Sequence, residues 1–265
     1  MSKIFISGST SGLGLLAARV MTKRGHAVHL HARSESQARQ GRLRCPEARG
    51  IFVADLASAD ATKRLAAELN AAGPWDAVIH NASHTGVVGR RHPAAMFPWH
   101  GPTELFAVNT LAPYLLTCLV RPPARRYVFL ASSMHRDGDA ALRDVERAGF
   151  ADTKLHSVML ARWFARHLNE GRAGDVVECC SVDPGISQVD TVNTPSTSGH
   201  IVAAVGVYVN HAEGRGAEGK GMAEGNGRYW SVDKVVPPLA EAEDEERQDQ
   251  LVELLKGISG VSLSG

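Results

Sequence analysis

The sequence contains few of the features that mark several classes of protein. Only four cysteines occur in 265 residues, with neither the spacing of a zinc site nor the density of a disulfide framework. With 29 basic and 28 acidic residues, the net charge of +1 creates no long-range field for nucleic acid or an anionic membrane. No apolar run approaches the length that crosses a bilayer. We therefore expect neither nucleic acid nor membrane as a partner, and we interpret the cysteines as small core residues: Cys45, Cys118, Cys179 and Cys180.

The start of the chain has no basic and long apolar regions of the kind that direct secretion, because an apolar strand already begins at Ile4. Together with the sparse cysteines, this favours a cytoplasmic protein. A chain of 265 residues with 44% hydrophobic content can bury a sizeable core. We predict a single domain over residues 1–265.

Short apolar runs alternate with segments of helical periodicity. The runs predict strands at residues 3–7, 27–31, 50–54, 77–80, 127–132 and 176–182. The periodic segments predict helices at residues 13–24, 59–70, 104–119 and 153–168. This alternation predicts an α/β fold, a doubly wound parallel sheet with helices on both faces.

Three further segments complete the predicted architecture. The charged run 241–250 leads into Leu251, Leu254 and Leu255, which predict a C-terminal helix packed on the body. Segments at about 83–102 and 187–227 are predicted as loops over the substrate, since ligands of open α/β sheets bind beyond the carboxyl ends of the strands. The glycine-rich end of the second segment also fits an ordinary surface loop. Trp99, in the first segment, is a candidate wall of the substrate pocket, with packing as the alternative.

A glycine-rich segment directly follows the first predicted strand and precedes a predicted helix. It reads Gly-Ser-Thr-Ser-Gly-Leu-Gly. Glycine lets the backbone approach a phosphate closely, and a helix N-terminus presents free N–H groups with a partial positive charge. Glycine spacing alone is a weak signal, but the flanking strand and helix favour binding of a dinucleotide pyrophosphate. The predicted phosphate-binding residues are Gly8, Ser9, Thr10, Ser11, Gly12, Leu13 and Gly14.

Arg33 and Ser34 follow the second predicted strand. A protein that binds the non-phosphorylated cofactor is expected to carry Asp or Glu there, for the ribose hydroxyls. A guanidinium group suits a 2′-phosphate instead, so NADP (NADPH) is the predicted cofactor. The alternative is a solvated arginine at a strand end.

With these motifs in place, the chain resembles the short-chain dehydrogenase/reductase family over nearly its whole length. Residues 7–14 match the cofactor motif of that family, and residues 80–83 resemble its Asn-Asn-Ala-Gly motif with both ends changed. The resemblance implies further cofactor contacts at Asp55, Leu56, Asn81, Ala82, Pro184, Gly185 and Ile186. It also implies a Rossmann-type dinucleotide-binding fold. Helices 104–119 and 153–168 form the dimer surface in much of the family, which makes a homodimer a candidate assembly.

The resemblance also implies the catalytic positions. Asn109 matches the structural asparagine, Ser133 the catalytic serine and Lys154 the catalytic lysine. More narrowly, the chain is similar to the retinol-dehydrogenase-like and actinobacterial or fungal branches, whose helix reads Tyr-Ser-Asp-Ser-Lys-Leu-His. Here that segment is Phe-Ala-Asp-Thr-Lys-Leu-His, so Phe150 replaces the catalytic tyrosine.

In the family, the tyrosine exchanges a proton with the substrate oxygen, the serine hydrogen-bonds this oxygen, and the lysine holds the nicotinamide ribose. Phe150 and Lys154 are four residues apart on a predicted helix, so we expect both near the nicotinamide. Loss of a positioned proton donor typically costs about a hundredfold to ten-thousandfold in rate. Reduction of an iminium ion tolerates this loss, because the hydride neutralises a charge already present. His135 is a candidate substitute, with a loop histidine bonded to backbone as the alternative.

The leading interpretation is an NADP(H)-dependent oxidoreductase that reduces a small organic carbonyl or imine and is either impaired by Phe150 or adapted to it. A replaced tyrosine and a natural phenylalanine both fit the sequence. The alternatives are a redox-inactive NADP-binding sensor or scaffold, and a non-redox cyclase or isomerase on the same fold. No metal site is predicted. The predicted substrate contacts are Ser133, His135, Trp99 and Phe150.

Overall fold

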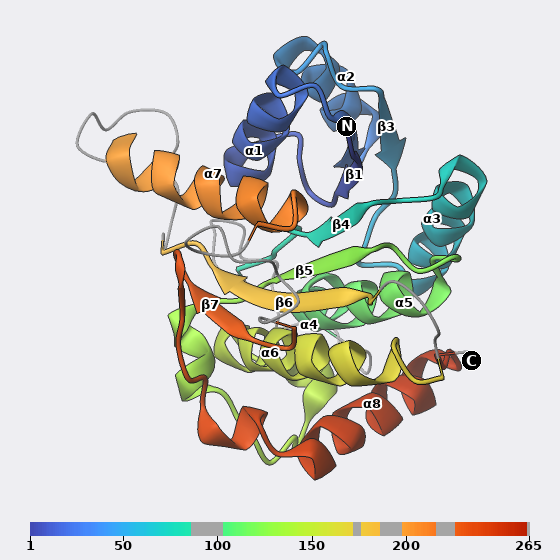
Figure 1. The fold of residues 1–265 in the computed structure, drawn as a ribbon. Coiled ribbons are helices and arrows are strands. Elements are labelled where there is room, and N and C mark those ends of the chain that lie inside the picture. Colours follow the sequence, from blue (N-terminus) through green and yellow to red (C-terminus); the bar gives the residue numbers. More distant parts are fainter. Residues whose placement is uncertain (86–102, 172–175, 186–197, 216–225, 264–265) are drawn as a thin grey trace, which may run out of the picture.

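The computed structural model describes residues 1–85, 103–171, 176–185, 198–215 and 226–263. Eight strands form one sheet in the order β3-β2-β1-β4-β5-β6-β7-β8, parallel throughout except for the antiparallel β7–β8 pair (Figure 1). The strands are β1 (Lys3–Ile6), β2 (Ala27–Ala32), β3 (Gly50–Val53), β4 (Ala77–His80), β5 (Arg126–Leu130), β6 (Glu178–Asp183), β7 (Tyr229–Ser231) and β8 (Lys234–Val235). The order reverses beside β1, which confirms the predicted doubly wound α/β fold.

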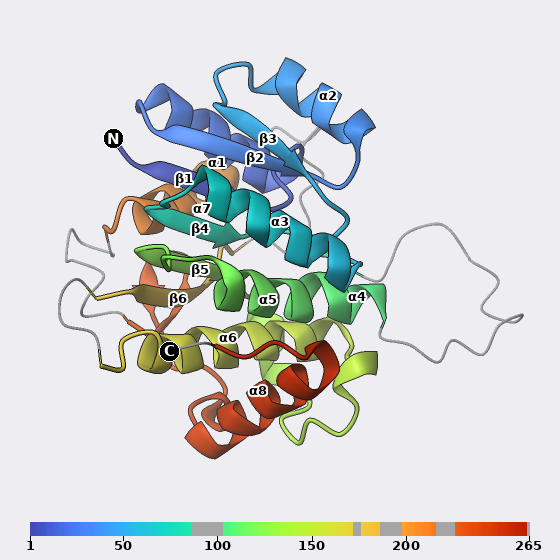
Figure 2. The same ribbon diagram turned by 90° about the vertical axis from the view of Figure 1, so that its right-hand side faces the viewer.

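Helices cover both faces of the sheet. Helices α1 and α7 pack together on one face, and α3, α5 and α6 form a layer on the other (Figure 2). The helices are α1 (Gly12–Lys23), α2 (Glu35–Arg44), α3 (Ala59–Ala72), the short α4 (Glu104–Phe106), α5 (Ala112–Leu119), α6 (Phe150–His167), α7 (Ser198–Ala212) and α8 (Glu245–Ser259). A π-helical turn, η1 (Ala107–Leu111), joins α4 to α5.

Two helices lie where the sequence predicts none, and each has a physical reason. Helix α2 is strongly polar and buries only Ala38 and Gly41, so it has no apolar stripe to reveal it. Helix α7 lies inside the segment 187–227 that is predicted as a loop, which corrects that prediction. It packs through Val205, Tyr208 and Val209, but its apolar residues are nearly continuous and give little helical periodicity.

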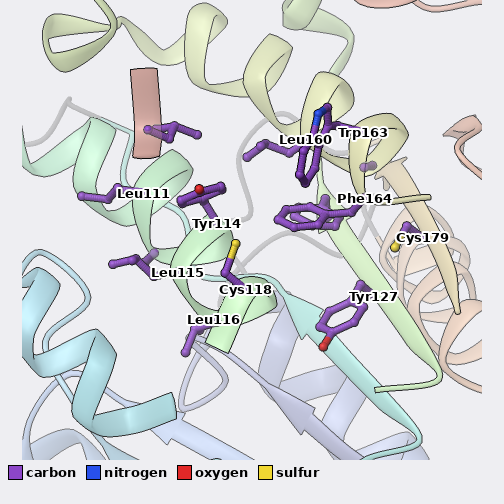
Figure 3. Packing of buried hydrophobic residues seen from close by; sticks show 14 of the residues in the cluster. Leu111, Tyr114, Leu115, Leu116, Cys118, Tyr127, Leu160, Trp163, Phe164 and Cys179 are labelled. Atoms are coloured by element: carbon purple, nitrogen blue, oxygen red, sulfur yellow. The ribbon is translucent and has the colours of Figure 1, made fainter. Parts of the chain in front are cut away.

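The larger core fills the space between the sheet and α5 and α6. Tyr114 of α5 and Phe164 of α6 lie with ring centroids 6.1 Å apart, above Tyr127 of β5 (Figure 3). The Tyr127 hydroxyl accepts a hydrogen bond from the Ala124 backbone N–H at 3.1 Å, which satisfies a buried polar group. All four cysteines are buried and unpaired, as predicted for core residues: Cys45, Cys118, Cys179 and Cys180.

The C-terminal helix α8 packs against the outer side of α6 (Figure 2). Leu251 and Leu255 are fully buried as predicted, whereas Leu254 is 37% exposed. Asp244 caps the start of α8, and Gly260, in the left-handed conformation with φ 68°, ends it.

Polar contacts lock α8 onto α6. The Trp163 indole N–H donates to Asp249 at 2.9 Å, and Arg166 pairs with Glu245 at 2.8 Å. Nearly all of α5 and most of α6 are buried within one chain. This burial leaves few exposed residues on the predicted dimer surface at 104–119 and 153–168. No helix among the described residues has the length and apolar character needed to cross a bilayer.

Candidate active site

A cleft of about 660 Å³ opens at the carboxyl ends of the central strands. It lies where the strand order reverses between β1 and β4, the position at which doubly wound sheets bind ligands. Residues after β1, β2, β3, β4, β5 and β6 all contribute to its wall. The cleft is therefore a single continuous site with a glycine-rich end and a Lys154 end.

The glycine-rich end is shaped by close backbone approaches. Gly8 has φ +61°, and a Cβ atom there would lie 2.8 Å from the Cα of Ala82. A Cβ at Gly14 would lie 2.5 Å from Nδ2 of Asn81. Only glycine fits both positions without displacing the chain after β4. These two glycines therefore let the loop pack closely against the segment after β4.

The N-terminus of α1 faces this end of the cleft through Ser11, Gly12 and Leu13. Among the described residues, no side chain caps α1 and its first turn has no acidic residue. In contrast, Ser34, Ser58 and Asp244 cap α2, α3 and α8. The amide groups and positive dipole of α1 therefore suit an anionic group such as a pyrophosphate.

Ser9 does not join this cradle, which corrects its predicted phosphate contact. Its backbone N–H donates to the carbonyl oxygen of His31 at 3.1 Å, and its hydroxyl donates to that of Ile6 at 2.8 Å. The His31 imidazole accepts a hydrogen bond from the Gly8 N–H at 3.0 Å and donates to the Ala54 carbonyl at 3.0 Å. Burial lowers the pKa of His31 to about 4, so the ring is neutral at pH 7.

A second polar network supports the cradle from behind. Asn81 Nδ2 donates to the carbonyl oxygens of Ser7 at 2.8 Å and Gly8 at 3.0 Å. The hydroxyl of Tyr208, on α7, donates to Asn81 Oδ1 at 3.1 Å. Because Asn81 and Tyr208 are both buried, these bonds hold the loop that joins β1 to α1 against α7.

Arg33 lines the cleft beyond β2, as predicted for a contact with a 2′-phosphate. Its guanidinium pairs with Glu104 at 3.3 Å, and its backbone N–H donates to Gln37 at 3.1 Å. Ser34 instead caps α2 by accepting from the Gln37 N–H at 3.4 Å and does not line the cleft. Its predicted cofactor contact is corrected to a helix cap.

At the other end, Lys154 and Phe150 lie one turn apart on α6, as the spacing predicts. The Lys154 ammonium donates to the Leu130 carbonyl at 3.0 Å and lies 5.1 Å from the centroid of the Phe150 ring. Lys154 is 3% exposed, and this desolvation lowers its pKa to about 7, against the opposing effect of the Asp183 carboxylate. The lysine therefore lies next to an apolar aromatic ring, at the position where the resemblance implies a lysine next to a tyrosine phenol.

Asn109 lies in the π-helical turn η1 and links two segments beside this end of the cleft. Its side-chain amide accepts from the His84 N–H at 2.7 Å and donates to the His84 carbonyl at 2.8 Å. It also donates to the Thr153 hydroxyl at 3.1 Å. Asn109 therefore positions the chain after β4 against α6 without itself lining the cleft, consistent with a structural role.

The structure places Ser132 in the cleft wall, and not Ser133. Ser132 is extended, with φ −160° and ψ 156°, and its hydroxyl accepts from the Met134 N–H at 3.3 Å. Ser133 begins a short 3-10 helix, η2 (Ser133–Asp137), is exposed, and donates its backbone N–H to Asp183 at 2.7 Å. Ser132 therefore joins the predicted Ser133 as a second candidate for the catalytic serine.

His135 is also displaced from its predicted role. It is fully buried, its Nδ1–H donates to the Ser132 carbonyl at 2.7 Å, and its Nε2 accepts from the Leu239 N–H at 3.0 Å. Both ring nitrogens are thus bonded to backbone, and burial lowers the pKa of the imidazole. The structure assigns His135 to packing beside Tyr229 and not to substrate contact.

Comparison with known proteins identifies the family. Residues 2–126 match the sequence model for short chain dehydrogenase. An uncharacterized oxidoreductase from Emericella nidulans is 34% identical over 100% of both chains. A short-chain dehydrogenase from Penicillium rubens is 34% identical over 99% of both chains. The chain belongs to the short-chain dehydrogenase/reductase family.

Solved structures of low sequence identity show the same fold. An uncharacterized protein from Mycobacterium paratuberculosis superposes with a TM-score of 0.79 at 19% identity, covering 100% of this chain and 96% of the other. A short chain dehydrogenase from Shigella flexneri complexed with NADP has a TM-score of 0.64 at 20% identity, covering 88% and 97%.

Most of the predicted site residues converge on the cleft. Those in its wall are Gly8, Thr10, Ser11, Gly12, Leu13, Gly14, Arg33, Asp55, Leu56, Asn81, Ala82, Phe150, Lys154 and Pro184. Gly185 lies next to the wall and donates its N–H to Asp183 at 2.8 Å. Trp99 and Ile186 lie outside the described residues.

Several wall residues were not predicted, among them Glu104, Met134, Asp183 and Tyr208. Asp183 is 6% exposed, and its oxygens accept from the N–H groups of Ser133 and Gly185, so it joins the ends of β5 and β6. Its place directly before Pro184-Gly185 at a strand end was a usable sequence signal. Tyr208 had none, because α7 itself was not recognised.

Proposed function

We propose that this short-chain dehydrogenase is an NADP(H)-dependent reductase of a small organic molecule, with an imine as the preferred substrate and a carbonyl as the slower one. The observation that carries the proposal is the buried Lys154 ammonium, 5.1 Å from the ring of Phe150 in the same cleft as Ser132. The cleft keeps a cation and a hydroxyl but offers no phenol at this position. A cytoplasmic location forms part of the proposal.

The choice of NADP is supported by Arg33, because a guanidinium forms strong paired hydrogen bonds with a phosphate. The cradle around Gly8 and the uncapped α1 fit the pyrophosphate of the same cofactor. The Shigella flexneri structure bound to NADP is consistent with this assignment, although its similarity extends only to the fold. Bound NADPH supplies the hydride.

The residues of the chain account for the substrate preference. Ser132 is suited to hydrogen-bond the oxygen or nitrogen of the substrate, and Lys154 is suited to hold the ribose hydroxyls. Phe150 is half-buried in the wall and presents an apolar face beside the reacting centre. An iminium carbon that accepts a hydride needs no proton in the same step, whereas a carbonyl must develop an alkoxide that this site stabilises poorly.

A second candidate function follows from the same phenylalanine. Without a phenol, the chain could bind NADP and not turn over, as a sensor or scaffold, or could catalyse a cyclisation or isomerisation guided by shape. These functions share the cofactor site with the reductase and differ in whether NADPH is consumed.

The test combines binding with turnover. NADPH fluorescence in the presence of the protein reports binding, and the decrease in absorbance at 340 nm reports consumption with cyclic iminium ions and with matched ketones. The reductase proposal predicts binding and consumption with at least one iminium substrate. Binding with no consumption across both panels would support the redox-inactive or isomerase alternatives, and no binding at all would refute every version.

A further inference from the structure

An ion pair crosses the mouth of the cleft at the end where the adenosine part of NADP(H) is expected to bind. Arg33 follows β2, and Glu104 begins α4, which follows β4 in the chain. In the sheet, β2 and β4 are the two neighbours of β1. The 3.3 Å contact between Arg33 Nη1 and Glu104 Oε1 therefore spans the carboxyl end of β1 and joins the two sides of the cleft.

Both partners are accessible to a ligand. The side chain of Arg33 is 57% exposed and that of Glu104 is 47% exposed, and both residues line the cleft. Asp55 and Leu56, which the family resemblance implies as cofactor contacts, line the same end of the cleft. An adenosine phosphate that reaches Arg33 must therefore enter next to the Glu104 carboxylate.

The charge of the 2′-phosphate distinguishes NADPH from NADH at this ion pair. A 2′-phosphate carries about −1.5 to −2 charges near pH 7 and competes with the carboxylate for one guanidinium group. The ribose hydroxyls of NADH carry no charge and cause no such repulsion. We propose that Glu104 is a specificity-determining residue, which reduces the preference of Arg33 for NADPH over NADH by holding the guanidinium and repelling the 2′-phosphate. This inference rests on the proposed function.

The test measures dissociation constants of NADPH and NADH by fluorescence titration and requires no turnover. The variant Glu104→Gln keeps the side-chain shape and removes the charge. We expect NADPH to bind about three- to tenfold more tightly to it, and NADH to change by less than about twofold. The difference should shrink as salt is raised, because exposed charges are screened. Glu68→Gln, on the exposed side of α3, is the matched control for net charge and should change neither constant.

A double-mutant cycle isolates the mechanism. In an Arg33→Gln background the guanidinium is absent, so Glu104→Gln should improve NADPH binding less than it does in the wild type. An unchanged ratio of the two dissociation constants in Glu104→Gln, or weaker NADPH binding, would overturn the inference while leaving the proposed cofactor intact. Failure of the wild-type chain to bind either cofactor would instead overturn the proposed function and this inference together.

Discussion

The Lys154 ammonium nitrogen lies 5.1 Å from the centroid of the Phe150 ring, inside a cleft that otherwise has the parts of a nicotinamide site. The lysine is buried and has one carbonyl partner among the described residues, Leu130. The aromatic face stabilises the cation but has no proton to exchange. The chemistry of the site therefore depends on whether the substrate demands a proton with the hydride.

Phe150→Tyr restores a phenol beside Lys154 and should raise kcat/KM for ketones by about a hundredfold to ten-thousandfold. Activity with iminium ions should change much less, since these need no proton in the hydride step. Steady-state assays at 340 nm with both substrates measure the two effects. Phe150→Leu serves as the control that changes shape without adding a hydroxyl. No gain with any ketone would argue against a carbonyl reductase ancestry of the site.

The two adjacent serines should differ sharply. Ser132→Ala removes the only serine of the pair that lines the cleft and should lower kcat/KM for ketones on the order of a hundredfold, as for loss of one donor to a developing oxyanion. Ser133→Ala should leave activity within about twofold, because its backbone N–H and not its hydroxyl contacts Asp183. Equal losses in both variants, measured at unchanged NADPH affinity, would contradict the assignment of Ser132.

Gly8→Ala should weaken NADPH binding by at least about tenfold and lower the free energy of unfolding by about 1–3 kcal/mol. Its Cβ would lie 2.8 Å from the Cα of Ala82, at a φ of +61° that disfavours alanine. Gly12→Ala has a similar φ of +56° but meets no atom within 4 Å, so it isolates backbone strain from the collision. Titration of NADPH and urea unfolding of both variants test the comparison. Equal losses in the free energy of unfolding of the two variants would assign the loss of stability to backbone strain alone.

Stability should fall in mild acid because several histidines are buried in neutral form. Burial lowers the pKa of His31, His156 and His211 to about 4. Since the unfolded chain takes up these protons near pH 6.5 and the folded chain only near pH 4, stability is full above pH 6.5 and is lost as pH falls toward 4. Each histidine contributes on the order of 2–3 kcal/mol over this window. Urea unfolding at pH 8, 6 and 5 measures the trend.

His211→Phe provides the matched variant for the acid effect. Within the described part of the chain its buried Nε2 has no hydrogen-bond partner, and its ring packs edge-on against Trp230, so an apolar ring fits the site. The variant should lose less stability between pH 8 and pH 5 than the wild type. An identical pH dependence in the two proteins would show that His211 does not titrate in this range.

The chain should be a monomer at micromolar concentration, because α8 already covers α6 and the Tyr114 hydroxyl donates to the Val261 carbonyl at 2.7 Å. Light scattering after size-exclusion chromatography gives the mass. Leu251→Asp places a charge in the α8–α6 contact and should lower stability strongly, whereas Leu254→Asp, at a 37% exposed site, should not. A wild-type dimer would mean that another surface associates.

The sequence predicts strands β1 to β6 and the glycine-rich turn before α1, because strand alternation and glycine spacing are local signals. It fails where the decisive information is three-dimensional. Two adjacent serines follow β5, and no local pattern shows which of Ser132 and Ser133 lines the cleft. The sequence does not reveal α2, because that helix buries few residues and so has no apolar stripe. It does not reveal α7, because the buried apolar residues of that helix are nearly continuous and show little helical periodicity. His135 lies just after β5, as a substrate contact would. Its Nε2, however, accepts a hydrogen bond from the backbone of Leu239, which is far away in the sequence.

The polar contacts between α6 and α8 have an evolutionary consequence. Trp163 and Asp249 share a hydrogen bond, and Arg166 and Glu245 share an ion pair, across two segments more than seventy residues apart. A change on α8 leaves the buried Trp163 indole N–H or the partly buried Arg166 guanidinium on α6 without its partner. The paired positions are therefore expected to be substituted together in related sequences. Such substitutions should appear as covariation between the two helices.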